Sequence, residues 1–313
     1  MSLALLAMSH SPLLEHADLD AELAAELDSE FAVAREFVRD YDPDVIVNFG
    51  PDHYNGFFYT LMPPFCIGYA AESIGDYGSQ AGRLDVPADT ARGLAEAVLA
   101  DGIDIAVSLD MQVDHGCIQP MELMYGDITA KPFIPIFINS VAPPFTPLAR
   151  VRHLGHAVGN HLSGLGQRVL LIASGGLSHD PPVPRMATAT PQQRKMLMGE
   201  GGPLDYEARA ARQQRVIDAA KAFTAGTSDI QELAPEWDRE LLRILASGDL
   251  SAVDSWSPQE MTRIAGNSSH EVRAWIAGYS ALAAVGTYTV QHSYYRPIPE
   301  LIAGFALTTV TLD

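Results

Sequence analysis

Apolar runs of strand length recur along the chain, and a histidine follows closely behind four of them. These segments are Leu3–His10, Val45–His53, Ile105–His115 and Val169–His179. In the second segment, VIVNFG is followed by a proline, an acid and the histidine, which indicates a buried strand, a break and polar side chains at the strand's carboxyl end. Open α/β sheets bind their ligands at that edge. The recurrence therefore predicts that the four imidazoles converge on one site.

Between these runs, apolar residues recur at helical spacing. Leu23, Leu27, Phe31, Ala34 and Val38 define one face of an amphipathic helix, which Asp-Pro-Asp ends before the next strand. Further helices are expected at Ala91–Ala100, Leu148–Leu165, Pro191–Ala225 (interrupted at 201–203), Glu236–Ala246 and Ser268–Ala284, and further strands at Ile134–Ile138, Thr287–Tyr295 and Leu301–Val310. Strands that alternate with helices are typical of a layered α/β domain.

Two segments depart from this regular pattern. The stretch Tyr69–Pro87 is rich in Gly, Ser, Asp and Tyr, which predicts a long loop at the rim of the site or in a subunit contact. Pro132 and Pro135 punctuate the run Ile134–Ile138. Because proline cannot donate a hydrogen bond to a neighbouring strand, this run is expected at an edge of the sheet.

The charge balance limits the partners that the protein can have. Among 313 residues, 20 Lys and Arg stand against 39 Asp and Glu, for a formal net charge of −19. Such a surface repels nucleic acid and anionic lipid, so we expect neither as a partner. No apolar run approaches the length that crosses a membrane. An anionic substrate would need a locally positive pocket.

The two cysteines, Cys66 and Cys117, are too few for a disulfide framework and favour a reducing cytoplasm. The N-terminal run Leu3–Met8 lacks basic flanking residues and is too short for a signal peptide, in agreement with a cytoplasmic location. Cys117 lies two residues after His115, which raises the possibility of a catalytic thiol, but a buried packing cysteine is the preferred interpretation.

The histidines could hold a metal ion if a carboxylate joined them. The best carboxylate is Glu271, in the segment NSSHEVRAW, although Ser268-x-x-Glu271 also has the pattern of a capping box that starts a helix. Two histidines and one carboxylate form the facial triad of non-haem Fe(II) oxygenases. Three other histidines on an expected helix, His153, His156 and His161, have no acid among them and are expected outside the site.

Several motifs together resemble those of the type III extradiol ring-cleavage dioxygenases. They are HSP at His10, NFGPDHYNGFF around His53, DHGCIQPMELMYG from Asp114, SGGLSHDPP around His179, APEWDRELLRILASGD from Ala234 and HEVRAW at His270. The resemblance covers nearly the whole chain. It implies one catalytic domain over residues 1–313, an α/β sandwich with a mixed central sheet flanked by helices, and a homo-oligomer.

The same resemblance implies the roles of the site residues. His10, His53 and Glu271 match iron ligands, and His115 and His179 match two catalytic histidines that move protons. The implied reaction is Fe(II)-dependent cleavage of 3-(2,3-dihydroxyphenyl)propionate, or its cinnamate analogue, with O2. Four arginines are open as partners of the substrate's carboxylate because an arginine fork suits that group. They are Arg185, Arg239, Arg243 and Arg273.

Two other functions fit parts of the same pattern. Imidazole and carboxylate ligands also suit zinc, so a zinc metallohydrolase is one alternative. A non-catalytic binding protein on the same fold is the other. The presence of both His115 and His179 argues against it, since a scaffold has no need for proton donors.

Overall fold

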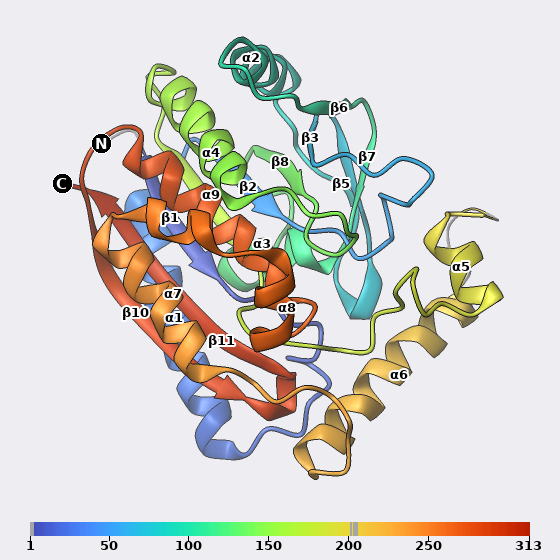
Figure 1. Ribbon diagram of the computed structural model, residues 1–313. Coiled ribbons are helices and arrows are strands. Elements are labelled where there is room, and N and C mark those ends of the chain that lie inside the picture. The colour runs from blue at the N-terminus through green and yellow to red at the C-terminus, as the bar shows by residue number, and fades with distance from the viewer. Residues whose placement is uncertain (1–2, 201, 203–205) are drawn as a thin grey trace.

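The computed structural model describes residues 3–200, 202 and 206–313, which form an α/β sandwich (Figure 1). Within these residues, one sheet has eight strands in the order β10-β11-β1-β9-β2-β8-β3-β6, and a second has three in the order β5-β4-β7. The strands are β1 Leu3–Met8, β2 Val45–Gly50, β3 Phe65–Gly68, β4 Ala71–Ile74, β5 Ala81–Arg83, β6 Ala106–Ser108, β7 Met111–Val113, β8 Phe133–Ile138, β9 Val169–Ser174, β10 Tyr288–Ile298 and β11 Ala303–Leu312. The large sheet is mixed, as predicted: β1, β9, β2 and β8 run parallel to one another. Strand β11 runs antiparallel to β1 and β10, and β3 runs antiparallel to β8 but parallel to β6.

Helices cover both faces of the large sheet. The helices of the described residues are α1 Ala21–Tyr41, α2 Ala88–Ala100, α3 His115–Tyr125, α4 Leu148–Ser163, α5 Pro191–Leu197, α6 Tyr206–Thr224, α7 Pro235–Ser247, α8 Pro258–Ala265 and α9 Val272–Ala283, of which α5 and α6 lie to one side of the sheet (Figure 1). In Figure 1, α4, α7 and α9 lie in front of the sheet and α1 lies behind it. The predicted interruption at 201–203 falls between α5 and α6, and its residues 201 and 203 lie outside the described residues.

Successive apolar side chains of the strands point to opposite faces of the sheet, which explains why helices lie on both faces. In β1, Leu3, Leu5 and Ala7 join the core packed against α2, α4, α7 and α9, whereas Ala4, Leu6 and Met8 join the core packed against α1 and α3. Successive side chains of a strand point to opposite faces, so a continuous apolar run demands cover on both. The predicted face of α1 is buried as expected, from Leu23 to Val38. None of the helices described here is long and apolar enough to cross a membrane.

The run Ile105–His115 is not the single strand that its sequence predicted. The chain turns at Leu109 and Asp110, so that β6 pairs with β3 in the large sheet and β7 pairs with β4 in the small one. Leu109 is exposed at this turn. His115 consequently begins helix α3, whose first turn is capped by the side chain of Asp114.

Two further expectations about loops and edges were wrong. The segment Tyr69–Pro87 is not one loop, because it contains β4, a 3₁₀ turn at Asp76–Gly78 and β5. Strand β8 is not at an edge but lies between β2 and β3. Pro135 is tolerated there because the pairing of β8 with β3 covers only Ile136–Ile138 and stops short of it.

Helices α4 and α9 approach each other at glycines of α4. A Cβ atom added to Gly159 would lie 2.0 Å from the carbonyl oxygen of Ala281, and one added to Gly155 would lie 2.2 Å from that of Ala277. Helix α9 is buried from Val272 to Leu282. Glycine in α4 therefore lets α9, the helix that follows Glu271, pack closely against α4.

We predict that Gly159→Ala destabilises the protein, although this change usually favours a helix. The added methyl group meets backbone that cannot move aside, so the free energy of unfolding should fall by about 1–3 kcal/mol. Gly164→Ala at the end of the same helix is the control, because its Cβ would lie 3.5 Å from the nearest heavy atom. Urea unfolding of both variants tests the contact, and equal stability would contradict it.

Candidate metal centre

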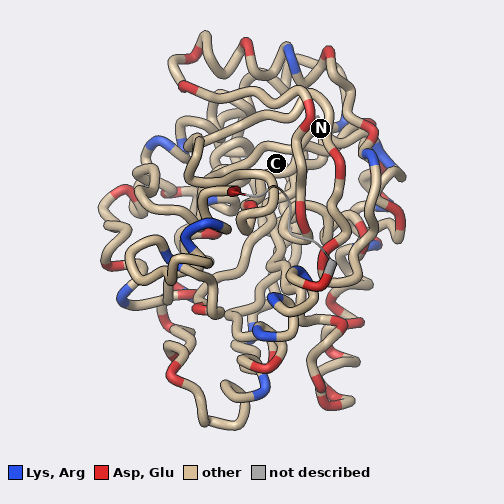
Figure 2. The backbone as a smooth tube through the Cα atoms, turned by 90° about the vertical axis from the view of Figure 1, so that its right-hand side faces the viewer, with Lys and Arg blue, Asp and Glu red and all other residues tan. Residues whose placement is uncertain are grey.

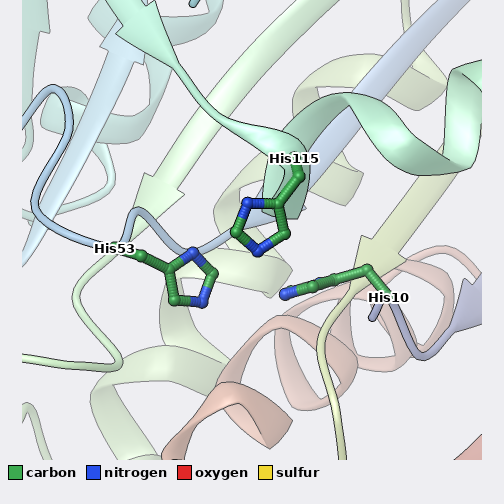
Figure 3. Close-up of side chains that lie close together, drawn as sticks. All are labelled: His10, His53 and His115. Carbon is green, nitrogen blue, oxygen red and sulfur yellow. The ribbon is translucent and has the colours of Figure 1, made fainter. Parts of the chain in front are cut away.

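The four histidines and Glu271 all line one cavity of about 550 Å³. His10 follows β1, His53 follows β2, His179 follows β9 and His115 begins α3. The ring centroid of His10 lies 5.5 Å from the ring centroid of His53 and 5.5 Å from that of His115. The centroids of His53 and His115 are 4.7 Å apart. Figure 3 shows these three rings turned toward one another. The predicted convergence of the imidazoles is therefore present in the structure.

His10 and His53 are each held by a partner on the Nδ1 side of the ring. The Nδ1 atom of His10 lies 3.0 Å from Ser174 Oγ, at the end of the neighbouring strand β9. The Nδ1 atom of His53 lies 3.1 Å from Asp114 Oδ2, and the backbone N–H of His53 donates to the same oxygen at 2.8 Å. Asn55 also donates to that oxygen, at 2.8 Å. Asp114 thus fixes both the backbone and the ring of His53.

His115 and His179 follow the same arrangement. The Nδ1 atom of His115 lies 2.6 Å from Asp76 Oδ2, while its backbone N–H donates to Asp76 Oδ1 at 2.8 Å. The Nδ1 atom of His179 lies 2.9 Å from the carbonyl oxygen of Leu177. A proton on Nδ1 in each of the four rings leaves Nε2 with a free lone pair, which is the form that metal binding and proton transfer require.

Glu271 occupies the centre of this group. Its Oε2 accepts the backbone N–H of Gly176 at 2.8 Å and lies 3.5 Å from His10 Nε2. Its Oε1 lies 3.2 Å from His53 Nε2 and 3.3 Å from His179 Nε2. Ser268 makes no capping hydrogen bond through its side chain. The capping-box interpretation of Glu271 was therefore wrong, because its carboxylate points into the site.

Burial and charge set the protonation of these groups. Burial lowers the pKa of His10 to about 3, which keeps this imidazole neutral. Burial acts in the same direction on His53, but Asp114 and Glu271 outweigh it and raise the pKa of His53 well above its usual value. Burial would raise the pKa of Glu271, yet His179, His10 and His53 reverse that effect and hold it well below its usual value. The site therefore contains an ionised carboxylate beside a neutral imidazole.

The residues that orient the histidines were not recognised from the sequence as functional. Asp114 directly precedes His115, so the Asp-His pair was visible, but nothing local showed that this carboxylate serves His53. Asp76 lies in the segment predicted as a loop, which does reach the rim of the site through Asp76 and Tyr77. The site also needs glycine at position 116, because a Cβ atom there would lie 2.9 Å from the His53 ring.

Other polar residues singled out in the sequence lie outside the cavity. Cys117 is buried, and burial raises the pKa of its thiol, which agrees with a packing role. His153 and His156 are exposed on α4. Of the four arginines considered for the substrate, none lines the cavity: Arg185, Arg239 and Arg243 are exposed, and Arg273 is buried against His270. The cavity has three arginines that sequence reasoning missed, all on α6: Arg209, Arg212 and Arg215.

The donor set fits a transition-metal ion. Two ligand atoms at right angles, each about 2.1 Å from an ion, lie about 3.0 Å apart. The two carboxylate oxygens of Glu271 come close to this spacing, Oε1 at 3.2 Å from His53 Nε2 and Oε2 at 3.5 Å from His10 Nε2. One nitrogen from each of His10, His53 and His115 also lies within 4.8 Å of the other two. Nitrogen and carboxylate ligands with Nδ1 held by the protein are typical of metal centres.

Comparison with known proteins assigns the family. Residues 4–306 match the family described as the catalytic LigB subunit of aromatic ring-opening dioxygenase. The chain is 57% identical over 312 residues to a 2,3-dihydroxyphenylpropionate/2,3-dihydroxicinnamic acid 1,2-dioxygenase of Rhodococcus globerulus, covering 100% of this chain and 99% of that protein. It is 56% identical over 313 residues to a protein of the same name from Rhodococcus rhodochrous, with the same coverage.

Among solved structures, an uncharacterised protein of Escherichia coli K12 aligns over 99% of both chains at 15% identity with a TM-score of 0.47, which is too low to support an argument. The match to the family and to its curated members spans nearly the whole chain. This protein therefore belongs to the LigB family of aromatic ring-opening dioxygenases and is an extradiol ring-cleaving enzyme.

Proposed function

We propose that the enzyme cleaves 3-(2,3-dihydroxyphenyl)propionate, or its cinnamate analogue, with O2 to a 2-hydroxy-6-oxo-dienedioate. The observation that carries this proposal is the buried Glu271 carboxylate with His10 and His53 at 3.5 and 3.2 Å, in a cavity large enough for a catechol. The printed names of the relatives supply the substrate. Membership of the ring-opening family favours this reaction over the alternatives of a zinc hydrolase and a binding protein.

His10, His53 and Glu271 would hold Fe(II) in this proposal. When bound there, Fe(II) would bind the catechol and let electron density pass from the catechol to O2. The protein contributes the geometry. Asp114 and Ser174 fix the two rings from the Nδ1 side, and the Gly176 N–H fixes the carboxylate. Since these partners come from the backbone and from buried side chains, the ligand positions are set before metal and substrate arrive.

His115 and His179 would move the protons. Ring cleavage requires a base that takes a proton from the catechol and an acid that assists the later carbon migration. By the family resemblance, we assign the base to Nε2 of His179 and the acid to Nε2 of His115. Each ring is fixed through Nδ1, by Leu177 and Asp76 respectively, so its Nε2 faces the cavity with a defined direction.

The cavity also provides an apolar wall for the aromatic ring. Pro181, Pro182, Val183 and Pro184 line it on the segment after His179. Apolar side chains there exclude water from the reacting groups and favour a flat ring. The family resemblance further supports a homo-oligomer, which sedimentation of the purified protein addresses, and the two free cysteines support a cytoplasmic location.

We predict that alanine at His10, His53 or Glu271 removes metal and activity together. Each change deletes a ligand and leaves the others with too few donors. His156→Ala is the matched control, because this histidine is exposed on α4 away from the cavity. Metal analysis of the purified variants gives the result. A Glu271→Ala protein that folds, keeps full metal and cleaves catechol would remove Glu271 from the ligand set.

We predict a different outcome for His115→Ala and His179→Ala. Both variants should retain metal and bind catechol, while turnover falls by about 10² to 10⁴, the usual cost of losing a general acid or base. Stopped-flow spectra of anaerobic catechol binding separate binding from turnover. Loss of metal in either variant would make that histidine a ligand, and near-normal turnover would show that its position in the cavity has no catalytic role.

We predict that the identity of the ion decides activity. Metal-free protein supplied anaerobically with Fe(II) should consume O2 when 3-(2,3-dihydroxyphenyl)propionate is added, because the ion must donate electron density to O2. Zinc fits similar ligands but has no redox chemistry, so the zinc form should consume none. Oxygen-electrode traces of the two forms give the answer. Full oxygen uptake by the zinc form would exclude the Fe(II) assignment.

A further inference from the structure

Helix α6 places three arginines in the wall of the cavity. Arg209, Arg212 and Arg215 recur every three residues, which keeps them near one face of the helix, and all three line the cavity beside the histidines. The chain as a whole has a net charge of −19. Figure 2, in which the side that carries α6 faces the viewer, shows acidic positions spread over the molecule and several basic positions close together in the lower centre. The three arginines therefore place positive charge on the α6 side of the cavity, which the buried Asp76 and Glu271 also line beside the histidines.

Two of these arginines have structural partners. Arg209 donates through Nη1 to the carbonyl oxygen of Ile74 at 3.0 Å, which ties α6 to strand β4. Arg212 donates through Nη2 to the carbonyl oxygen of His53 at 2.6 Å, so its guanidinium lies directly beside the proposed metal centre. A guanidinium has five N–H groups, and this contact uses one of them.

Arg215 is different because it has no hydrogen bond or ion pair with any residue that the structure describes. The acids lining the same cavity are otherwise engaged: Asp76 pairs with His115, Glu271 lies among the histidines, and Asp218 accepts a hydrogen bond from Gln214. Arg215 nevertheless lies close to the site. Burial raises the pKa of Tyr77 to about 12, and the charges of Arg212 and Arg215 partly offset that rise. Tyr77 in turn packs edge-on against His115, with ring centroids 5.1 Å apart.

We propose that Arg215, assisted by Arg212, binds the carboxylate of the substrate's side chain. This inference rests on the proposed function, which provides a substrate with one carboxylate remote from the bonds that change. The side chain of a 3-substituted catechol is attached to the ring carbon next to a hydroxyl group. When the hydroxyl groups face the histidines, the side chain extends along the cavity wall, and α6 supplies the positive part of that wall. A guanidinium fork matches a carboxylate in shape and charge.

The subsite would select anionic side chains. The remaining lining near the apolar wall offers prolines and Val183, which suit the ring but not a carboxylate. Arg215 has no competing acid as a partner, so its charge is available to the substrate. In this proposal the arginine contacts the side chain of the substrate and not the bonds that change, so its loss should raise KM more than it lowers kcat.

The test compares 3-(2,3-dihydroxyphenyl)propionate with 3-propylcatechol, which has the same ring and a neutral tail. In Arg215→Gln holoenzyme, kcat/KM for the propionate should fall about 10- to 100-fold, the effect of losing a charge-assisted hydrogen bond. The value for 3-propylcatechol should stay within about twofold, because this substrate makes no such bond. Arg215→Lys should keep part of the propionate activity, since it retains the charge without the fork.

Lys221→Gln is the matched control: it removes the same charge from the same helix, at a residue that does not line this cavity. It should leave both substrates unchanged. Equal losses on both substrates in Arg215→Gln, or no loss on either, would overturn the subsite while ring cleavage by the wild type stands. Failure of the wild type to cleave either catechol would remove the proposed function and the subsite with it.

Discussion

The site depends on one buried carboxylate and the imidazoles that surround it. Removing the charge of Glu271 from water is costly unless opposite charge or hydrogen bonds replace the lost hydration. A single backbone N–H, that of Gly176, bonds to it directly, and three Nε2 atoms approach it within 3.5 Å. The arrangement is best satisfied by a cation. Trp275, one turn further along, donates to the carbonyl oxygen of Gly175 at 2.8 Å and so fixes the same segment relative to α9.

The elements that local pattern determines were predictable from the sequence. Strands β1, β2 and β9 and the buried face of α1 follow from apolar runs and helical spacing, and the histidines behind the three strands lie where open α/β sheets bind ligands. The failures share a physical cause. Whether Ile105–His115 continues as one strand depends on which sheets receive its two halves, and whether Glu271 caps a helix or faces a cavity depends on the distant Gly176 and His53. Such partners are remote in sequence and leave no local pattern.

The sequence was equally unable to show which arginine could bind the substrate's carboxylate. Any arginine can bind a carboxylate, so composition could not distinguish Arg185 or Arg243 from Arg215. The fold does so by pairing: Arg185 lies 2.8 Å from Asp180 and Arg243 lies 2.6 Å from Glu240, whereas Arg215 faces the cavity. Arg215 lines the catalytic cavity and has no hydrogen-bonding or ionic partner in the described part of the chain, which is more informative than the number of arginines in the sequence.

The three proposed metal ligands, His10, His53 and Glu271, are far apart along the sequence. In the unfolded chain these groups are far from one another, so an ion could contact all of them only after the large sheet and α9 have assembled. A bound ion therefore links the first strand to the last helix and restrains the intervening chain, as a covalent cross-link closing a very long loop would. The metal would consequently act as a structural clamp as well as a catalyst, and its loss would loosen the fold at the carboxyl edge of the sheet, where the substrate binds.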